Sequence, residues 1–455
     1  MQIFGSSGTR GEVGAAFEPE FVLRVARAAA TVWGADRVAL ARDTRTTGGM
    51  FADAAAAGVA ATGTDVVRLG VAPTPATVRH CGEASVPGIQ ITASHNPPEY
   101  NGVKLIGPEG SGLPVGELER VEEALLSESF AATAWDDVGN RTQAAVVEPY
   151  VDEMLTAVDR EAIAAADLTV AVDPGHGAAA DAAPAFFRRL GCDVVTVNAQ
   201  PDGHFPGRPS EPTPETLTDL GRLVQAGDAD VGVAHDGDGD RAVFVDETGT
   251  VVSGDASLAA LAERALSSGD TAVSAVNVSQ RLVDVCDRVG ADLELTPIGA
   301  TNIVTRIREL WDADRSVPVA GEGNGGVFFP GYRLSRDGPF VGAKFLELLA
   351  EREEPVSEVI RPYTDYHTVR DSLSYDGEDE RTAMLSAAET FAEAADAEPQ
   401  TTDGYRLDYG DAWVLVRESG TEPKLRVYAE SDDRDRAGTL AATAADRLRE
   451  ARASA

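Results

Sequence analysis

The amino-acid sequence predicts an α/β protein with three related α/β domains, whose sheets are mixed and largely parallel, followed by a C-terminal α+β domain. Two observations predict this fold class. Short β-branched runs alternate with alanine-rich helical stretches, which is the pattern of βαβ units. This strand–helix–strand pattern begins near residues 38, 168 and 271, and after Pro362 it changes to short strands at hairpin spacing. The length of 455 residues fits about 3–4 domains of ~100–200 residues each.

Each of the three modules is expected to contain a strand, a helix and a second strand. The expected ranges are 38–41, 51–62 and 65–69 in the first module, 168–172, 179–190 and 193–197 in the second, and 271–276, 279–289 and 292–295 in the third. In the C-terminal domain we expect strands at 405–409, 413–417 and 425–429, and helices near 381–395 and at 436–451. We expect the domains to span residues 1–148, 149–252, 253–362 and 363–455.

The charge of the chain excludes two classes of partner. It carries 75 acidic and 39 basic side chains, a formal net charge of −36. Nucleic-acid binding by phosphate neutralisation needs a basic face, and an anionic membrane would repel this chain, so both partners are excluded. Only three basic residues are lysines, Lys104, Lys344 and Lys424. This composition indicates adaptation to high salt, where a Debye length of ~3 Å screens self-repulsion. An ordinary acidic cytosolic protein is the alternative.

The cysteines and the apolar runs bear on the compartment of the protein. Cys81, Cys192 and Cys286 are odd in number, far apart and match no zinc spacing, so we expect reduced core residues. No apolar run approaches the ~18 residues that a transmembrane helix needs. The start of the chain has neither the charged nor the apolar segment of a signal peptide. These observations predict a cytoplasmic protein.

A serine follows the apolar run 88–91. Ser94 stands in a turn rich in Asn and Pro at the carboxyl end of this predicted strand, where ligands of α/β sheets bind. We do not expect His95 to act as its base, because neighbours in an extended strand point to opposite sides and no Gly-x-Ser-x-Gly elbow is present. The alternative is a turn stabilised by Asn or Ser side chains that carries no chemistry.

Three aspartates alternate with two glycines near the middle of the chain. Asp236, Asp238 and Asp240 can converge on one hard cation, and Mg²⁺ prefers oxygen ligands at ~2.0–2.1 Å. An EF-hand is a rival interpretation, because the aspartates match its first three ligands and Glu247 stands at its twelfth position. Arg241 opposes it where the EF-hand needs Gly, and the flanking runs are typical of strands, not helices. We favour a magnesium site over a solvated acidic turn.

Two later loops have the composition of ligand-binding segments. In the loop 321–326, glycines let the backbone approach a ligand, and Glu322 and Asn324 can bind vicinal hydroxyls. Taken alone, this loop would be interpreted as a flexible turn. The loop 417–426 combines a charged fork, hydroxyls and a glycine in the manner of a phosphate cradle, with Arg417, Ser419, Gly420 and Thr421. A surface hairpin with paired Arg and Glu is the alternative, and the retained Lys424 favours phosphate.

Two further segments complete the set. The loop 5–11 offers small residues, hydroxyls and Arg10, and Lys104 follows the serine loop. A serine, a three-aspartate metal site, a polyol-binding glutamate and two phosphate cradles together describe phosphoryl transfer between a protein hydroxyl and a sugar phosphate.

Along its whole length the chain resembles the α-D-phosphohexomutases, and within them the archaeal phosphoglucosamine mutase and phosphomannomutase branch. Seven motifs carry the resemblance in the right order, at residues 4–11, 41–45, 92–97 with 101–104, 205–215, 236–241, 321–326 and 417–428. The resemblance implies four domains around a central cleft, with the last domain different in kind.

The resemblance also implies a role for each candidate residue. Ser94 would be the phosphoserine, and its phosphate would hold Mg²⁺ together with Asp236, Asp238 and Asp240. Sugar hydroxyls would be contacted by Glu322 and Asn324. The phosphate that is not transferred would be bound by Arg417, Ser419, Gly420 and Thr421. The transferring group would be surrounded by Arg10, Lys104 and Arg241, with Lys104 as a candidate general acid or base.

The implied reaction interconverts hexose 6-phosphate and hexose 1-phosphate through phospho-Ser94 and a 1,6-bisphosphate that turns over in the cleft. By analogy we expect glucosamine phosphate as substrate, with a phosphomannomutase/phosphoglucomutase of the same mechanism as the alternative. Many relatives have Ser and His where this chain has Asn324 and Gly326, which weakens the transfer of substrate preference. A phosphosugar hydrolase and a non-catalytic metal- or sugar-binding protein are the other classes. We expect a monomer or a homodimer.

Overall fold

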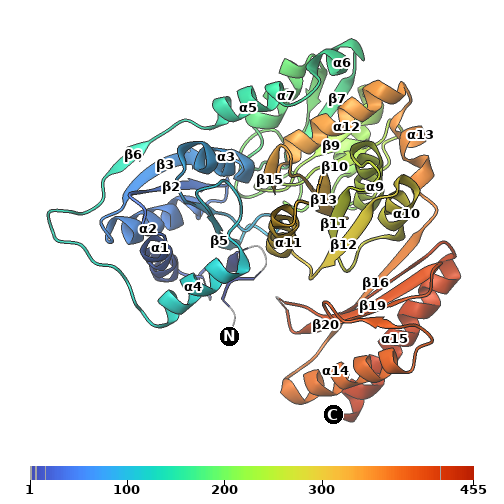
Figure 1. Cartoon of the computed structure of the whole chain (residues 1–455). Coiled ribbons are helices and arrows are strands. Elements are labelled where there is room, and N and C mark those ends of the chain that lie inside the picture. Colours follow the sequence, from blue (N-terminus) through green and yellow to red (C-terminus); the bar gives the residue numbers. More distant parts are fainter. Residues whose placement is uncertain (1–2, 6–7, 16, 421) are drawn as a thin grey trace.

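The computed structural model describes residues 3–5, 8–15, 17–420 and 422–455. Its strands form four sheets in four consecutive parts of the chain, which we call domains I to IV (Figure 1). Domains I to III are α/β with mixed, largely parallel sheets, and domain IV packs two helices on an antiparallel sheet. The predicted fold class is confirmed.

Domain I contains β1 (Thr9–Glu12), α1 (Pro19–Trp33), β2 (Arg37–Arg42), α2 (Gly48–Ala60), β3 (Asp65–Val71), α3 (Thr74–Ala84), β4 (Gly88–Ile91), β5 (Tyr100–Ile106), α4 (Val115–Leu126) and β6 (Arg141–Gln143). Its six-stranded sheet has the order β1-β5-β4-β2-β3-β6. β2 pairs in parallel with β3 and β4, whereas β5 is antiparallel to β4 and β1. The carboxyl ends of β2 and β4 therefore point to the same edge of the sheet.

Domain II contains α5 (Val147–Thr156), α6 (Arg160–Ala165), β7 (Thr169–Asp173), α7 (Ala182–Leu190), β8 (Asp193–Thr196), α8 (Thr218–Ala226), β9 (Val231–Ala234) and β10 (Val243–Val245). Its sheet has the order β10-β9-β7-β8. β7 is parallel to β8 and β9, and β10 returns antiparallel to β9. The loop between β9 and β10 is the one that carries the three aspartates.

Domain III contains α9 (Gly254–Ala265), β11 (Thr271–Ala275), α10 (Gln280–Val289), β12 (Asp292–Thr296), α11 (Ala300–Asp312), β13 (Val319–Glu322), β14 (Gly326–Phe329), β15 (Arg333–Arg336), α12 (Gly338–Arg352) and α13 (Val356–Ile360), with a 3-10 turn at Arg361–Tyr363. Its sheet has the order β12-β11-β13-β14-β15. β11 is parallel to β12 and β13, and β13, β14 and β15 form an antiparallel meander.

Domain IV contains β16 (His367–Ser374), α14 (Glu378–Glu393), β17 (Pro399–Gln400), β18 (Tyr405–Asp408), β19 (Ala412–Glu418), β20 (Lys424–Ser431) and α15 (Arg434–Ser454). All pairs in its sheet, β16-β20-β19-β18-β17, are antiparallel. In Figure 1 this domain lies below domain III, and a single connecting segment of the chain links it to α13.

Capping residues fix where several helices begin and end. The side chains of Ser279, Asp337 and Asp433 accept hydrogen bonds from the first free N–H groups of α10, α12 and α15. Such a cap satisfies a donor that has no partner inside the helix. At the other end, α1 stops at Gly34 in a left-handed conformation that glycine adopts without strain.

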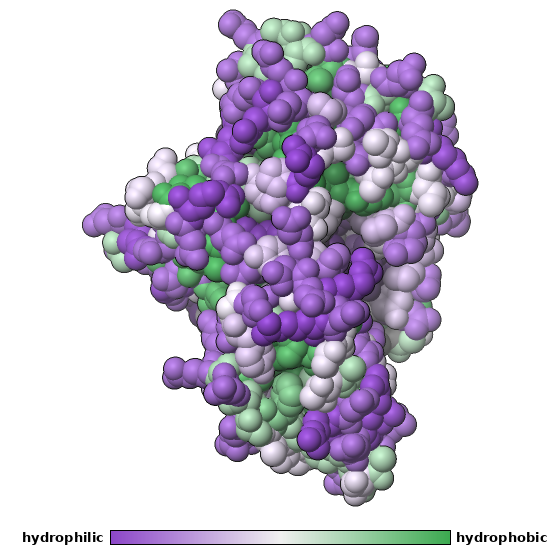
Figure 2. Space-filling view, turned by 90° about the vertical axis from the view of Figure 1, so that its right-hand side faces the viewer, coloured by the Kyte–Doolittle hydropathy of each residue, from purple (hydrophilic) through white to green (hydrophobic). Residues whose placement is uncertain are grey.

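One hydrophobic core runs through domains I, II and III, from Ala39 to Tyr363. Domain IV has a core of its own between Leu373 and Leu448, and a small apolar cluster around Trp413 joins it to domain III. Cys81, Cys192 and Cys286 are buried free thiols, as predicted. Hydrophilic residues dominate the face shown in Figure 2, in keeping with the composition. Among the described residues, no helix combines the length and the apolarity that a membrane crossing requires.

Candidate active site

Three aspartate side chains converge in the loop between β9 and β10. Asp236, Asp238 and Asp240 are buried, and each offers a carboxylate oxygen within 4.8 Å of the others. Oδ1 of Asp238 and Oδ1 of Asp240 are buried with no hydrogen-bond partner in the described part of the chain. Leaving a buried carboxylate oxygen without a partner is costly, so these two atoms fit a bound cation. A donor set made only of oxygens suits a hard ion such as Mg²⁺.

The rival EF-hand interpretation is wrong. Glu247, its twelfth position, accepts hydrogen bonds from the backbone N–H of Ser357 at 3.1 Å and from the Ser357 hydroxyl, so its carboxylate is held by another segment. The two elements that flank the aspartate loop are antiparallel strands and not the helices of an EF-hand.

Ser94 faces the aspartate loop. Its side chain is buried, and its Oγ donates a hydrogen bond of 2.6 Å to Asp236 Oδ2. The backbone N–H of Ser94 donates to Thr92 Oγ1 at 2.8 Å, and that hydroxyl donates to Asp43 Oδ2 at 2.7 Å. The carboxyl ends of β2 and β4 thus meet, as a parallel sheet requires, and they fix the serine in place.

The backbone around Ser94 is clamped from both sides. Arg45 forms a buried ion pair with Asp43 at 3.1 Å, and its Nη2 donates to the carbonyl oxygens of Ser94 at 3.0 Å and Asn96 at 2.6 Å. On the side of domain II, a Cβ at Gly237 would lie 2.5 Å from the Ser94 carbonyl oxygen. Only glycine allows this approach, so the serine loop and the aspartate loop are packed directly against each other.

The expectation that His95 points away from Ser94 is wrong. Ser94 has a φ of 51°, in the left-handed region, so the alternation of an extended strand does not apply. His95 Nδ1 lies 3.3 Å from Ser94 Oγ and accepts a hydrogen bond of 2.9 Å from Arg241 Nη2. Burial and the neighbouring cations Arg241 and Arg10 lower the pKa of His95 well below its usual range. The imidazole is therefore neutral, and the donor on Nδ1 places its proton on Nε2.

Basic side chains from domains I and III surround the aspartates. Lys104 Nζ donates to Asp238 Oδ2 at 2.6 Å and to Asp240 Oδ2 at 2.9 Å. Arg336 Nη2, from domain III, reaches the same oxygen of Asp240 at 2.6 Å. Arg10 Nη1 donates to Asn96 Oδ1 at 3.1 Å, and burial lowers its pKa to about 10. Although the protein carries a net negative charge, cationic side chains are concentrated around the aspartates, as a site that binds phosphate groups requires.

The aspartates differ in their electrostatics. Burial, together with the neighbouring charges of Asp240 and Asp238, raises the pKa of Asp236 to about 7. Burial alone would also raise the pKa of Asp240, but Arg336, Lys104 and Arg241 lower it below its ordinary value. Burial and like charges therefore raise the pKa of Asp236, whereas opposite charges lower the pKa of its neighbour Asp240.

The loop 321–326, which is predicted to bind sugar, places Glu322 beside this cluster. Glu322 ends β13, is buried, and its Oε2 is 4.0 Å from Arg336 Nη1. Asn324 is exposed, and its Oδ1 accepts from the backbone N–H of Gly326 at 3.0 Å. A cavity of about 80 Å³ between domains I and III is lined by the site residues Lys104, Asp240 and Arg336.

The loop 417–426 of domain IV, which is predicted to bind phosphate, has its own contacts. Arg417 Nε donates to Asp403 Oδ2 at 3.0 Å, and Ser419 N–H donates to the carbonyl oxygen of Lys424 at 2.9 Å. A Cβ at Gly420 would meet open space, and Thr421 lies outside the described residues. No hydrogen bond or ion pair joins the described residues of this loop to the loop 236–241.

Several residues of the site were missed by the sequence reasoning. Arg336 and Thr74 both contact the aspartates, Arg336 at Asp240 and Thr74 through a hydroxyl that donates to Asp238. Neither stands in a glycine-rich or repeated pattern, so no local signal marks them. The retained Lys344 pairs with Glu347 on α12, so its retention did not indicate a site residue.

Models of the phosphoglucomutase/phosphomannomutase family match the chain in four consecutive segments. Alpha/beta/alpha domain I matches residues 1–132, domain II 148–249 and domain III 253–366, and the C-terminal domain matches 378–447. The phosphoglucomutase/phosphomannomutase of Thermococcus kodakarensis is 38% identical over 444 residues, which cover 96% of each chain. The probable phosphoglucosamine mutase of Methanopyrus kandleri is 37% identical over 441 residues, 96% of this chain and 95% of that one.

Solved structures agree with these matches. A phosphoglucomutase/phosphomannomutase family protein from Burkholderia thailandensis superposes with a TM-score of 0.83 at 28% identity, over 99% of this chain and 96% of that one. A putative phosphomannomutase from Thermus thermophilus gives a TM-score of 0.82 at 27% identity, over 99% of both chains. The chain therefore belongs to the phosphoglucomutase/phosphomannomutase family of the α-D-phosphohexomutase superfamily and is a phosphohexomutase.

Proposed function

We propose that the protein interconverts glucosamine 6-phosphate and glucosamine 1-phosphate through phospho-Ser94 and a 1,6-bisphosphate. The observation that carries the proposal is the contact of 2.6 Å between Ser94 Oγ and Asp236 Oδ2, in a buried cluster that leaves two carboxylate oxygens unpartnered. A serine that only shaped a turn would not need to face a cation site.

The proposed transfer exchanges one P–O bond for another. The bond between phosphorus and Ser94 Oγ breaks, a bond from phosphorus to a sugar hydroxyl oxygen forms, and the hydroxyl proton passes to Ser94 Oγ. Lys104, whose Nζ lies 2.6 Å from Asp238 Oδ2, is the proposed acid or base for this proton. Arg10 and Arg241 would balance charge on the transferring group. Asp236, Asp238, Asp240 and the serine phosphate would hold Mg²⁺, which supplies neutralisation of phosphoryl oxygens when bound.

Substrate binding is proposed to divide between two loops. Glu322 and Asn324 would contact sugar hydroxyls. The position of Glu322 supports this role, since its carboxylate is buried beside Arg336 at the edge of the metal cluster. The phosphate that is not transferred would be held by Arg417, Ser419, Gly420 and Thr421. The bisphosphate would turn over so that its two phosphates exchange places between domain IV and Ser94, which lets either phosphate face Ser94.

The choice of glucosamine is supported by relatives such as those of Methanopyrus kandleri and Methanocella arvoryzae, which are named probable phosphoglucosamine mutases. A phosphomannomutase/phosphoglucomutase is the second candidate, since the Thermococcus relative carries that name at 38% identity. A coupled assay in molar KCl against glucosamine, glucose and mannose 6-phosphates decides between them. Turnover confined to mannose and glucose phosphates would overturn the glucosamine assignment, and release of inorganic phosphate without a bisphosphate would indicate a hydrolase.

The cellular setting is also a proposal. Three buried free thiols support a cytoplasmic location, and the acidic, lysine-poor composition supports function at high salt. We propose domain spans of 1–148, 149–252, 253–362 and 363–455, supported by the short gaps between the matched family segments. A monomer or a homodimer remains our expectation for the assembly.

A further inference from the structure

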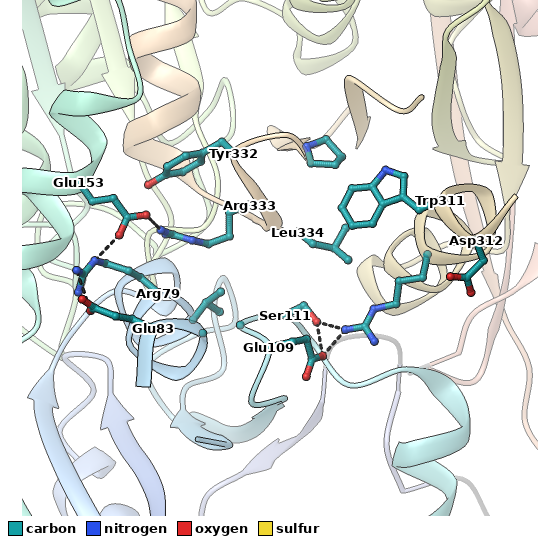
Figure 3. A pocket seen from close by; sticks show the side chains of 15 residues that line it. Arg79, Glu83, Glu109, Ser111, Glu153, Trp311, Asp312, Tyr332, Arg333 and Leu334 are labelled. Atoms are coloured by element: carbon teal, nitrogen blue, oxygen red, sulfur yellow. Dashed lines mark hydrogen bonds and ion pairs between the residues drawn. The ribbon is translucent and has the colours of Figure 1, made fainter. Parts of the chain in front are cut away.

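The short strand β15 has its two ends in different surroundings. Arg333, at its start, faces a groove of about 690 Å³ where domains I, II and III meet, and it pairs there with Glu153 of α5 (Figure 3). Glu109, which lies apart from Arg333 and Glu153 in Figure 3, lines the same groove and pairs with Arg308. Arg336, at the end of the strand, is buried and belongs to the aspartate cluster. One four-residue strand therefore joins an interdomain surface to the active site.

Arg336 has two carboxylate neighbours from different domains. Its Nη2 donates to Asp240 Oδ2 of domain II at 2.6 Å, and its Nη1 lies 4.0 Å from Glu322 Oε2 of domain III. This is the only ion pair of Glu322 within the described ranges of the chain. A guanidinium is planar and presents a fixed fork of donors, so it sets the separation of two acceptors in a way that an ammonium cannot.

Gly326 makes room for this arginine. It stands directly opposite Glu322 across the β13–β14 hairpin. A Cβ built at Gly326 would lie 2.7 Å from Arg336 Cδ, 3.1 Å from Arg336 Nη1 and 2.9 Å from Asn324 Oδ1. The φ of Gly326 is not in the left-handed region, so the backbone does not demand glycine there. The side chains of Arg336 and Asn324 therefore leave no room for a side chain at 326, and Arg336 makes the shortest approach.

We propose that Arg336 is a positioning residue that fixes the sugar-loop carboxylate Glu322 relative to the metal-loop carboxylate Asp240, and that Gly326 exists to admit it. The proposal rests on the proposed function for its effect on turnover. It links recognition of the sugar, through domain III, to the geometry of the metal cluster in domain II. A displacement of about 1 Å at a reacting centre costs on the order of 10²-fold in rate, so such a link affects turnover without touching the transferring group.

The test is a double-mutant cycle between Gly326→Ala and Arg336→Ala, read in kcat/KM and in the Mg²⁺ Kd measured by calorimetry with the metal alone. We expect Arg336→Ala to lower kcat/KM by on the order of 10²-fold and Arg336→Lys to restore part of it. Gly326→Ala should cost about 10-fold in the wild-type background and clearly less beside Arg336→Ala, because the side chain that its methyl group approaches most closely is gone. Equal costs in both backgrounds would overturn the proposal.

The metal readout separates this proposal from the proposed function. Arg336→Ala removes a cation that competes for Asp240, so Mg²⁺ should bind about 10-fold more tightly while turnover falls. Arg308→Gln, which removes an ion pair between domains I and III away from the cluster, should leave both readouts within about 2-fold. A wild-type protein without mutase turnover counts against the proposed function alone. An unchanged Mg²⁺ Kd in Arg336→Ala, or no Mg²⁺ binding by the wild type, counts against the positioning role.

Discussion

Arg281 Nη1 lies 3.0 Å from Glu430 Oε2, and both side chains are buried between domains III and IV. Glu430 also accepts hydrogen bonds from the backbone N–H of Gln280 at 2.7 Å and from Trp413 Nε1 at 3.1 Å. Arg281 donates to carbonyl oxygens of the connecting segment, at Tyr363 and Tyr366. One buried ion pair therefore fixes the segment through which domain IV is attached.

We expect Glu430→Ala to destabilise the protein by about 3–5 kcal/mol, because it leaves the Arg281 charge buried without its partner. The measurement is the free energy of unfolding in urea. Glu358→Ala is the control, since it removes an exposed pair with Arg361 and should cost less than about 1 kcal/mol. Equal effects of the two variants would contradict the claim that the buried ion pair between Arg281 and Glu430 holds the connecting segment in place.

Ser94→Ala should abolish mutase turnover. No other described hydroxyl donates to Asp236. Intact-mass measurement should show one phosphate on the active wild-type protein, lost on incubation with excess hexose monophosphate and absent from the variant. Ser111→Ala, a buried serine of the interdomain groove, is the control and should keep both the phosphate and the activity. A fully active Ser94→Ala protein would contradict the phosphoserine mechanism.

Asp238→Asn should weaken Mg²⁺ binding by at least about 10-fold and remove most Mg²⁺-dependent turnover, because an amide is a poorer ligand of a hard cation than a carboxylate. The fold should remain intact, since loss of one carboxylate also relieves repulsion within the cluster. Calorimetric titration with Mg²⁺ and circular dichroism check the two statements. An unchanged rate at limiting Mg²⁺ would speak decisively against a metal role.

Glu322→Gln should reduce turnover for every hexose phosphate tested. Hydrogen bonds from sugar hydroxyls to a charged carboxylate contribute roughly 1.5–3 kcal/mol, which corresponds to losses of about 10- to 150-fold. The measurement is kcat/KM for glucosamine, glucose and mannose 6-phosphates. If the loss appears with only one of the sugars, Glu322 determines selectivity and not general binding.

The buried carboxyl of Asp337 makes stability depend on pH. Burial raises its pKa to about 6, and it accepts hydrogen bonds from Tyr150 Oη at 2.5 Å and Phe340 N–H at 3.1 Å. A raised pKa means that the folded state holds the proton more tightly than the unfolded state. The stabilisation is therefore present below about pH 4 and is lost as the pH rises through about 6.

Unfolding free energies of wild type and Asp337→Asn, measured between pH 4 and pH 7, check this sign. The difference between wild type and variant should become less favourable to the wild type by about 2–3 kcal/mol as the pH rises. A difference that stays constant with pH would show that Asp337 does not titrate in this range.

The sequence predicted the fold class, the strand–helix–strand units that begin near residues 38, 168 and 271, and the convergence of the three aspartates, because these follow from local patterns. It did not predict the contact between Ser94 and His95, since that contact depends on one left-handed residue that alternation rules do not anticipate. It also missed Arg336, which is 96 residues from Asp240 and reaches it only through the order of strands in domain III. Tertiary placement of a lone arginine leaves no pattern in the sequence.

The distribution of hydrophobic cores determines how the molecule should unfold. Because one core cluster is shared by domains I, II and III, these three domains should be coupled more tightly to one another during unfolding than to domain IV. Domain IV keeps a separate core between Leu373 and Leu448, so it can open or melt as a unit of lower stability while the others remain folded. Its partial unfolding would release the loop 417–426, for which we propose phosphate binding, yet leave Ser94 and the aspartates assembled. Loss of substrate affinity and loss of the metal cluster should therefore occur at different temperatures.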